Sequence, residues 1–360
     1  MIKKIGSVVL AAFAALLILG LWLSSLLEDD SHRQTLEQTR PEALAYLRSA
    51  IMPSRGKILA VVTSTDSMGA SGRYTGYELT ELARAYYVFT ANGFEVDIAS
   101  PAGGEPPAVI DTDDMGAYDY AFINDAQAQR KLTHSLPLAE VNGDVYEAVY
   151  FVGGKGAMFD FPGNGAIQAL VRRYFETGKV IGAVCHGPAA LVEVTLSNGR
   201  PLVEGRRVSG FTNEEELLLI PGAREIFPFL LQEQLTALGA RFYSGPVYLN
   251  TISQDKNLLT GQNPWSVWSL AEAMISQLGY RPLPRELTGE EHAVAVLERY
   301  ETLGNGAARA MLTELSEQRR PLTRNLIAMH SIVALMQLKV GKAIDLVGLV
   351  WRAKQLDLSS

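Results

Sequence analysis

The chain has 360 residues, of which 48% are hydrophobic and 20% are charged, and this globular composition excludes disordered, collagen-like and coiled-coil chains. Its 32 Lys and Arg residues against 39 Asp and Glu residues give a formal net charge of -7, so charge offers no reason to expect a nucleic-acid partner. The single cysteine, Cys185, excludes an internal disulfide and a zinc cage built from cysteines. The length predicts one large domain with additions, or two domains.

The first feature along the chain is an uncharged apolar run from Ile5 to Leu27, preceded by Lys3 and Lys4. A membrane-spanning helix needs about 20 apolar residues, whereas the apolar region of a signal peptide has roughly 7–15 and precedes a small-residue cleavage site. The run therefore favours a retained, single-pass transmembrane signal anchor over residues 1–30, with a cleaved signal peptide as the alternative. The lysines predict an inner (cytoplasmic) membrane location with the rest of the chain in the periplasm.

Residues 31–55 are polar and charged, and their second half carries Leu44, Leu47 and Ile51 at helical spacing before Pro53. This pattern predicts a stalk that contains a helix and ends in a turn.

From residue 56 onward, strands alternate with helices. Helical stripes begin at Leu79 and Ile167, and each is followed by a glycine stop. Alternation of this kind implies right-handed crossovers, and it predicts an α/β fold with a flavodoxin-like, mainly parallel sheet sandwiched by helices. The active site is then expected at the carboxyl ends of the strands. The segments that predict these strands cover residues 58–63, 94–99, 145–152 and 180–184, and the first of them is a continuous apolar run.

Cys185 directly follows the last of these runs, within Gly182-Ala183-Val184-Cys185-His186-Gly187-Pro188. Small residues on both sides of the cysteine are typical of a nucleophile elbow, in which a sharp turn exposes the side chain above the sheet. The backbone N–H groups of the following helix would favour the thiolate, which is the reactive form. A buried structural thiol is the alternative, and the strand-end position with the following His-Gly-Pro favours the nucleophile.

Eight motifs occur in the order seen in the ThiJ/PfpI family, in the branch of glyoxalase III and the heat-shock chaperone-like proteins. The chain resembles this family over about residues 56–280. The motifs are Thr75-Gly76, Glu81, Ser100-Pro101-Ala102-Gly103-Gly104, Gly153-Gly154-Lys155-Gly156, Asp160-Phe161-Pro162, Ala183-Val184-Cys185-His186-Gly187-Pro188, Gly210-Phe211-Thr212-Asn213 and Thr260-Gly261-Gln262-Asn263-Pro264.

The resemblance implies a catalytic role for four side chains. Cys185 corresponds to the family's nucleophile and His186 to its neighbouring acid or base. The family's helix glutamate falls on Glu81, with Glu78 as the rival on a nearby helical face. The acidic residue that orients the histidine falls within residues 213–216, and Glu215 has the best register.

Gly153 and Gly154 follow a predicted strand, so their backbone N–H groups could form an oxyanion hole. Many members of the branch have Gly-Gly-His-Gly here, and Lys155 takes the place of the histidine. A cation at the pocket rim would change substrate preference. Only His134 and His186 lie in the catalytic region, without partners at metal-ligand spacing, so we expect neither a metal ion nor another cofactor.

The resemblance implies glutathione-independent glyoxalase activity, in which Cys185 attacks a small 2-oxoaldehyde such as methylglyoxal and a 2-hydroxy acid is released. Peptidase and protein deglycase activity, which use the same cysteine, are alternatives within the wider family. Glutamine amidotransfer is disfavoured, because related amidotransferases take their histidine from a distant segment. A non-enzymatic chaperone or redox sensor is the alternative from a different class.

After the linker 281–284 the pattern becomes helical, and residues 285–360 are expected to form an all-helical extension. Residues 325–356 resemble one tetratricopeptide-like helix pair, which is too short to be stable without further packing. We therefore expect these helices to pack on the catalytic domain, on a protein partner or on a second copy. Members of the family often form homodimers, although no interface can be identified from the sequence.

Overall fold

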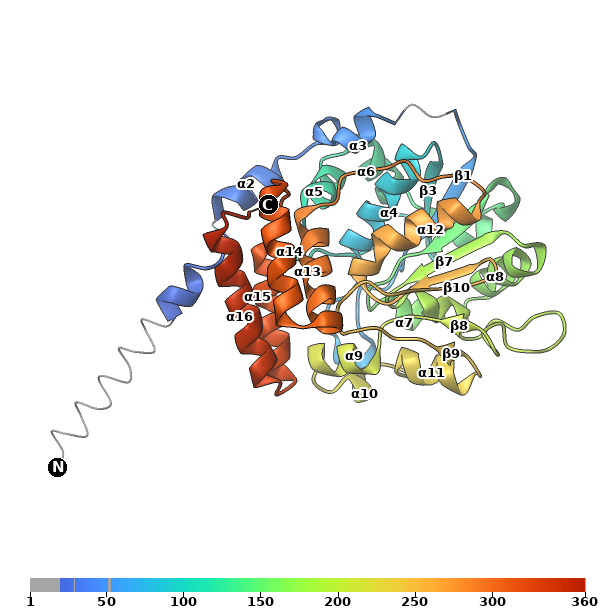
Figure 1. Ribbon diagram of the computed structural model, residues 1–360. Helices are drawn as coiled ribbons and strands as arrows, with labels where there is room; N and C mark the ends of the chain where they lie inside the picture. Colours follow the sequence, from blue (N-terminus) through green and yellow to red (C-terminus); the bar gives the residue numbers. More distant parts are fainter. Residues whose placement is uncertain (1–19, 29, 51–52, 360) are drawn as a thin grey trace. The chain divides into compact units, whose positions relative to one another are not determined.

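The computed structural model describes residues 20–28, 30–50 and 53–359, and this part of the chain divides into two compact units (Figure 1). We call Thr35–Glu286 the α/β unit. The helical unit joins the described residues up to Gln34 with Leu287–Ser360.

The α/β unit is built on a seven-stranded sheet with the order β10-β11-β7-β6-β1-β3-β5. All neighbouring strands in it run parallel except β10 and β11. The prediction of a mainly parallel sheet is therefore confirmed, and its four predicted strands appear as β1, β3, β6 and β7. The strands are β1 (Lys57–Val61), β3 (Glu95–Ser100), β5 (Leu136–Pro137), β6 (Ala148–Phe151), β7 (Val180–Val184), β10 (Ile252–Asp255) and β11 (Leu258–Gly261).

Helices cover both faces of this sheet because its crossover connections run in opposite directions along the sheet. The connection from β1 through α4 (Leu79–Ala91) to β3 runs one way along the sheet, and that from β6 through α8 (Gly165–Thr177) to β7 runs the other way. Right-handed crossovers in opposite directions place their helices on opposite faces. The strand order reverses between β1 and β6, and ligands of such folds bind beside this reversal, at the carboxyl ends of the strands. Helix α12 (Val267–Gln277) packs beside α4.

The remaining elements of the α/β unit are short. Two small parallel pairs join β2 (Tyr77–Glu78) with β4 (Ala108–Val109) and β8 (Arg207–Val208) with β9 (Arg241–Phe242). The short helices are α3 (Ala45–Arg48), α5 (Ala117–Ile123), α6 (Ala126–Thr133), α7 (Ala157–Asp160), α9 (Asn213–Leu219), α10 (Ala223–Ile226) and α11 (Leu231–Ala237), with 3-10 turns η1 (Pro41–Ala43), η2 (Gly69–Ser71), η3 (Leu138–Glu140), η4 (Gly143–Val145), η5 (Gly187–Leu191) and η6 (Pro264–Ser266).

Part of the segment predicted as a stalk lies in the core of the α/β unit. Leu44 and Tyr46 are buried there, and the Tyr46 hydroxyl accepts a hydrogen bond of 2.8 Å from Nδ2 of Asn92, at the end of α4. The predicted helix is reduced to the single turn of α3, and Ile51 lies outside the described residues. The segment therefore contributes to the packing of the α/β unit.

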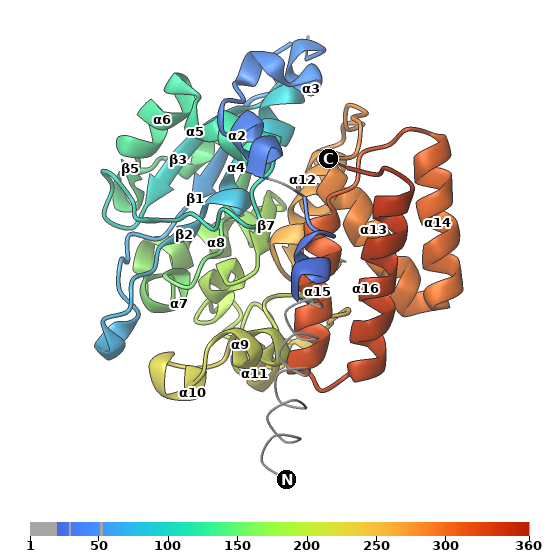
Figure 2. The same ribbon diagram turned by 90° about the vertical axis from the view of Figure 1, so that its left-hand side faces the viewer.

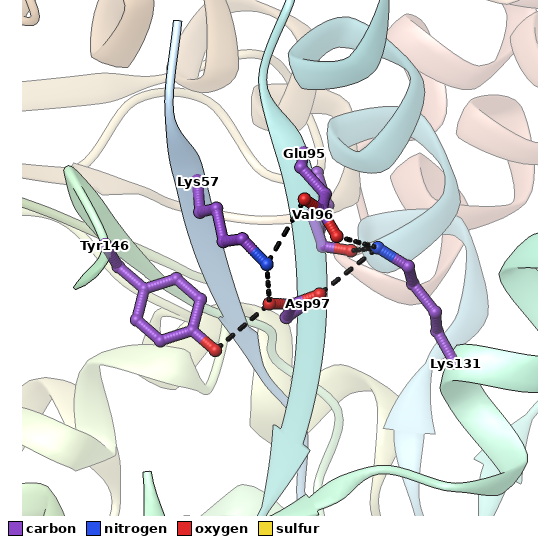
Figure 3. A network of polar contacts seen from close by, with 6 residues as sticks. All are labelled: Lys57, Glu95, Val96, Asp97, Lys131 and Tyr146. Carbon is purple, nitrogen blue, oxygen red and sulfur yellow. Dashed lines mark hydrogen bonds and ion pairs between the residues drawn. The ribbon is translucent and has the colours of Figure 1, made fainter. Parts of the chain in front are cut away.

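A polar network holds the amino-terminal edge of the sheet, opposite the expected active site (Figure 3). Lys57 at the start of β1 forms ion pairs with Glu95 at 3.2 Å and Asp97 at 3.3 Å, both on β3. Lys131 of α6 forms ion pairs with the same two carboxylates, each at 3.2 Å. The Tyr146 hydroxyl donates to Asp97 at 3.1 Å. Side chains at this edge therefore link β1, β3 and α6, and they lie away from the carboxyl ends of the strands.

The helical unit confirms the predicted carboxyl-terminal helices. Helix α13 contacts α14, and α15 contacts α16, as antiparallel neighbours joined by short loops do, and α13 also contacts α15 while α14 contacts α16 (Figure 2). The helices are α13 (Gly289–Leu303), α14 (Asn305–Glu317), α15 (Arg324–Met336) and α16 (Val340–Gln355), and α2 (Asp30–Glu37) spans the boundary between the units. The likeness to a tetratricopeptide pair stays a prediction.

The predicted membrane location is contradicted. None of the helices in the described ranges is long and apolar enough to cross a bilayer. Residues 5–19, which make up most of the predicted span, lie outside the described residues. Beyond them, the helix that includes Gly20 ends at Ser24, and Leu26 is buried. The backbone N–H of Glu28 donates to Asn325 at 2.9 Å, and the Glu28 carboxylate accepts from the Arg324 N–H at 3.1 Å, so this segment is bonded to the start of α15.

Candidate active site

Cys185 lies in a sharp turn at the carboxyl end of β7. Its φ of 57° is in the left-handed region, and its side chain is buried. Its N–H donates to the Gly261 carbonyl at 3.0 Å, and its carbonyl accepts from the Phe211 N–H at 2.8 Å. Gly187 has to be a glycine, because a Cβ there would lie 2.3 Å from the Phe151 carbonyl oxygen. The chain therefore turns out of the sheet at Cys185, held by bonds on both sides.

His186 connects the thiol to a carboxylate. Its Nδ1 lies 3.3 Å from Sγ of Cys185, and its Nε2 lies 2.6 Å from Oε2 of Glu216. A carboxylate can only accept hydrogen bonds, so Nε2 carries a proton, and a ring that is protonated there alone presents the Nδ1 lone pair to the thiol. The ring packs against Phe211 with 4.6 Å between centroids, and both His186 and Glu216 are buried. This geometry is that of a base oriented by an acidic partner.

The carboxylate that contacts the histidine is Glu216, and the prediction of Glu215 for this position is wrong. Oε2 of Glu215 accepts hydrogen bonds from the N–H and hydroxyl of Thr212, at 3.0 and 2.8 Å, in a capping box that begins α9. Its Oε1 accepts from the Tyr248 N–H, Nε2 of Gln262 and Nδ2 of Asn263 at 2.8 to 3.0 Å. Glu215 therefore holds three loops together while the next residue faces His186.

Glu81 approaches the thiol from the first turn of α4. It is fully buried, and its Oε2 accepts a hydrogen bond of 2.8 Å from the Gly153 N–H. The other carboxyl oxygen is buried without a hydrogen-bond partner among the described residues. Burial raises the pKa of Glu81 to about 8, against opposing interactions with Cys185, the Gly153 N–H, Arg84 and Lys155. Glu81 is thus mostly protonated at neutral pH and can exchange a proton near pH 8.

The surroundings of Cys185 disfavour the thiolate that the sequence led us to expect. Burial is the main cause that raises the pKa of Cys185 well above its usual value, and the Glu81 carboxylate adds to the shift. Lys155 acts in the opposite direction but does not outweigh them. The element after Cys185 is a five-residue 3-10 turn, and such a short turn supplies little of the dipole that a longer helix would. The proton therefore has to leave when the substrate arrives.

The two glycines predicted for an oxyanion hole differ in their hydrogen bonding. The Gly153 N–H is taken by Glu81, so the predicted pair is incomplete. The N–H groups of Gly154 and His186 donate no hydrogen bond within the described residues. Gly154 has a φ of 97°, and a Cβ there would lie 2.4 Å from the Gly76 carbonyl oxygen, so only glycine fits this turn. Lys155 follows it and is half-buried.

Glu78, the rival for the helix glutamate, is also close to the site. Its N–H donates to the Gly153 carbonyl at 3.2 Å. Burial and the neighbouring Glu81 raise its pKa well above the usual range. The structure therefore brings Cys185, His186, Glu81 and Glu78 together around the turn at Gly153.

A buried ion pair supports the helix that carries Glu81. Arg84 lies one turn further along α4, and its guanidinium contacts the Asp119 carboxylate at 3.1 Å, with both side chains almost fully buried. The same guanidinium donates to the Asp114 carbonyl at 2.7 Å and lies over the ring of Trp265. These contacts join α4, α5 and η6 beneath the site.

Within the described ranges, no group of three or more His, Cys, Asp or Glu side chains is arranged to hold a metal ion.

The α/β unit matches a known family. A family model described as the DJ-1/PfpI family matches residues 73–277, and the chain belongs to this family. This confirms the resemblance that the sequence motifs indicated.

Three relatives illustrate the similarity. The glutathione-independent glyoxalase HSP31 of Saccharomyces cerevisiae is 31% identical over 238 residues, which cover 63% of this chain and 99% of that protein. Glyoxalase 3 of Candida albicans is 25% identical over 227 residues, covering 61% of this chain and 96% of that protein. The X-ray structure of Rapid Encystment Protein 24 kDa from Francisella tularensis has 35% identity and a TM-score of 0.59, covering 62% of this chain and 99% of that one. The glyoxalase relatives support an enzyme of the glyoxalase III kind.

Proposed function

We propose that the chain is a glutathione-independent glyoxalase that converts a small 2-oxoaldehyde, such as methylglyoxal, into a 2-hydroxy acid. One observation carries the proposal: a single buried thiol lies between the Nδ1 lone pair of His186, at 3.3 Å, and the carboxyl group of Glu81. Two groups that can move protons on either side of one nucleophile suit a reaction that forms a bond to sulfur and then shifts a hydrogen. The names of the glyoxalase relatives support this chemistry.

The first step forms a bond from sulfur to the aldehyde carbon. His186 takes the thiol proton at Nδ1 as Sγ of Cys185 attacks, and the imidazolium is stabilised by Glu216 at 2.6 Å. The proton then moves to the former aldehyde oxygen, which gives a neutral hemithioacetal. The unoccupied N–H groups of Gly154 and His186 suit stabilisation of the transient oxyanion.

The second step moves a hydrogen between neighbouring carbons. Ionised Glu81 removes the proton from the carbon bound to sulfur, and the electrons shift onto the ketone oxygen to give an enediolate. Glu81 returns this proton to the former ketone carbon, and the hydroxyl proton of the first carbon moves to the enediolate oxygen, so that a thioester of the 2-hydroxy acid results. A carboxyl group with a pKa of about 8 is a stronger base than an ordinary glutamate, and a measurable fraction of it is ionised at neutral pH.

Water completes the reaction. Hydrolysis of the thioester releases the 2-hydroxy acid and restores the thiol, so the sum of the steps adds one water to the 2-oxoaldehyde. No oxidant, reductant or glutathione enters this balance.

The test is methylglyoxal consumption and lactate formation by the full chain. The unmodified protein should consume methylglyoxal without glutathione, and Cys185→Ala and Glu81→Gln should lower kcat by at least about 10³-fold. Equal activity in the Cys185→Ala variant would refute the proposal. A panel of peptides and glycated proteins, assayed in parallel, distinguishes the peptidase and deglycase alternatives.

Solvent deuterium examines the role of Glu81. In D2O the proton on a carboxyl group exchanges with solvent, so lactate formed through Glu81 should carry deuterium at its second carbon. Lactate without deuterium there would indicate a direct hydride shift and would remove Glu81 from the proton transfer.

A further inference from the structure

We propose that Glu78 and Lys155 form a polar subsite beside the reacting carbons, which selects 2-oxoaldehydes that carry a hydroxyl group on the carbon next to the ketone. This inference rests on the proposed function and names the substrate class of the same site. It would make methylglyoxal, which has a methyl group at that position, the poorer substrate.

The two side chains flank the turn that touches the nucleophile. Glu78 ends β2, and its N–H is bonded to the Gly153 carbonyl at 3.2 Å. A Cβ on Gly154 would lie 2.6 Å from the backbone nitrogen of Glu78, so the two segments are in close contact, and Lys155 is the next residue. A Cβ on Gly153 would lie 2.7 Å from Cβ of Cys185. The backbone of Glu78 and the residue before Lys155 are therefore in close contact at a turn that lies against the cysteine.

Neither side chain is paired within the described residues. Oε1 of Glu78 is buried without a hydrogen-bond partner, and no other described group bonds to its carboxyl. Lys155 forms no ion pair with a described carboxylate. Buried polar groups are almost always hydrogen-bonded, and an unsatisfied one costs about 1–3 kcal/mol. A ligand that bonds to both groups would recover this cost.

The exposure of these residues indicates where a substrate enters. Cys185 and Glu81 are 5% and 0% exposed, whereas Glu78 and Lys155 are both partly exposed. Both partly exposed groups interact electrostatically with Glu81, and Lys155 also acts on the thiol. They therefore lie between the buried reacting groups and the surface, where the part of the substrate beyond its two carbonyl carbons would lie.

The chemistry of the two groups fits a hydroxyl. Burial and the neighbouring Glu81 favour the neutral form of Glu78, against the opposing effect of Lys155, and this form offers one O–H donor and one carbonyl acceptor. The ammonium group of Lys155 offers only donors. A substrate hydroxyl can donate to Glu78 and accept from Lys155 at once, whereas a methyl group leaves both without a partner. Sites that hydrogen-bond a substrate hydroxyl discriminate strongly against analogues that lack it.

The experiment compares two aldehydes that differ by a single hydroxyl, 3-hydroxy-2-oxopropanal and methylglyoxal. The unmodified full chain should have a kcat/KM at least about 10-fold higher for the hydroxylated aldehyde. In Glu78→Leu and in Lys155→Met this ratio should fall toward one. Glu78→Gln keeps a donor and an acceptor and should retain most of the preference. Glu140→Leu, which changes an exposed glutamate outside the site, should leave the ratio unchanged.

The ratio separates a role in specificity from a structural one, because a variant that only disturbs the fold lowers both activities together. A preference that is absent from the unmodified enzyme, or that persists in both Glu78→Leu and Lys155→Met, overturns the inference while the glyoxalase proposal stands. Failure of the unmodified chain to consume either aldehyde overturns the proposed function, and this inference with it.

Discussion

The two units of the chain differ in what they bury. In the described part of the helical unit, the buried polar residues are His292, His330 and Ser331, and the rest of its core is apolar. The α/β unit has ionisable side chains in its interior, and several of them are almost fully inaccessible. These are Glu81, Arg84, Asp119, His186, Glu215 and Glu216.

Stability alone does not explain why the α/β unit buries ionisable side chains. Burying a charged or titratable group is unfavourable unless it is paired, and an apolar core of equal size would be at least as stable. The α/β unit nevertheless keeps a thiol, a histidine and two carboxyl groups in contact at one strand end. Changes in the α/β unit should therefore affect both activity and stability, whereas changes in the helical unit should affect stability alone.

The largest expected effect is on activity, and it distinguishes the adjacent residues Glu216 and Glu215. Glu216→Gln should lower kcat/KM for the 2-oxoaldehyde by about 10³–10⁴-fold, because an amide no longer fixes the histidine tautomer or stabilises the imidazolium. Steady-state kinetics on the folded variant, with circular dichroism to verify folding, measure the loss.

Glu215→Gln is the matched control. Its carboxylate accepts five hydrogen bonds that join Thr212, Tyr248, Gln262 and Asn263, so the variant should lose stability and keep its activity within about 10-fold. The reverse order of the two activities would return the orienting role to Glu215.

The next largest effect is on stability and compares two ion pairs. Arg84→Met leaves the Asp119 carboxylate buried without its guanidinium partner, and the free energy of unfolding should fall by about 3–5 kcal/mol. Urea unfolding followed by tryptophan fluorescence measures this change.

Lys342→Met supplies the corresponding change in the helical unit. The ion pair of Lys342 with Glu301 is partly exposed, so its removal should cost at most about 1 kcal/mol. Similar losses in both variants would show that burial does not distinguish the pairs.

The sequence predicted the sheet and the thiol because both depend on local patterns. Strand-like segments of five to eight residues that alternate with helical stripes indicate parallel strands, and β7 was predicted with its observed bounds, Val180–Val184. The small residues around Cys185 likewise indicate a turn at a strand end, and its φ of 57° agrees.

The sequence led us to predict Glu215 as the carboxylate that orients His186, one residue before Glu216, which contacts the ring. A local signal that distinguishes the two glutamates nevertheless exists. Thr212 followed three residues later by Glu215 is the sequence of a capping box, which uses the glutamate at the helix start. Recognition of this pattern would have assigned Glu215 to the helix cap and predicted Glu216 as the partner of His186. The family register alone could not distinguish adjacent glutamates.

The electrostatics of the site could not be predicted, because they arise from contacts between distant segments. Glu81 and Gly153 are 72 residues apart, and only the fold shows that this carboxyl group occupies the N–H expected to bind an oxyanion. The raised pKa of the thiol likewise follows from burial, which no motif encodes.

The last effect that we predict is the pH dependence of stability. In the folded chain the pKa of Glu81 is raised from 4.5 to about 8, so between these values unfolding releases its proton and stability falls as pH rises. The contribution is about 1.4 kcal/mol per pH unit. Glu81→Gln cannot ionise, and its free energy of unfolding, measured in urea at pH 5, 6 and 7, should fall less steeply by about that slope.

His292 of the helical unit should show the opposite sign. Burial lowers its pKa from 6.5, against the hydrogen bond that its Nδ1 makes with the Pro321 carbonyl, at 2.8 Å. Below pH 6.5 the unfolded chain binds a proton that the folded chain does not, so this contribution to stability is lost as pH falls toward the lowered pKa. His292→Gln should therefore flatten the acid side of the stability profile, while Glu81→Gln flattens the side that declines toward pH 8. If both variants changed the same limb of the profile, the buried titratable groups of the two units would not act in opposite directions.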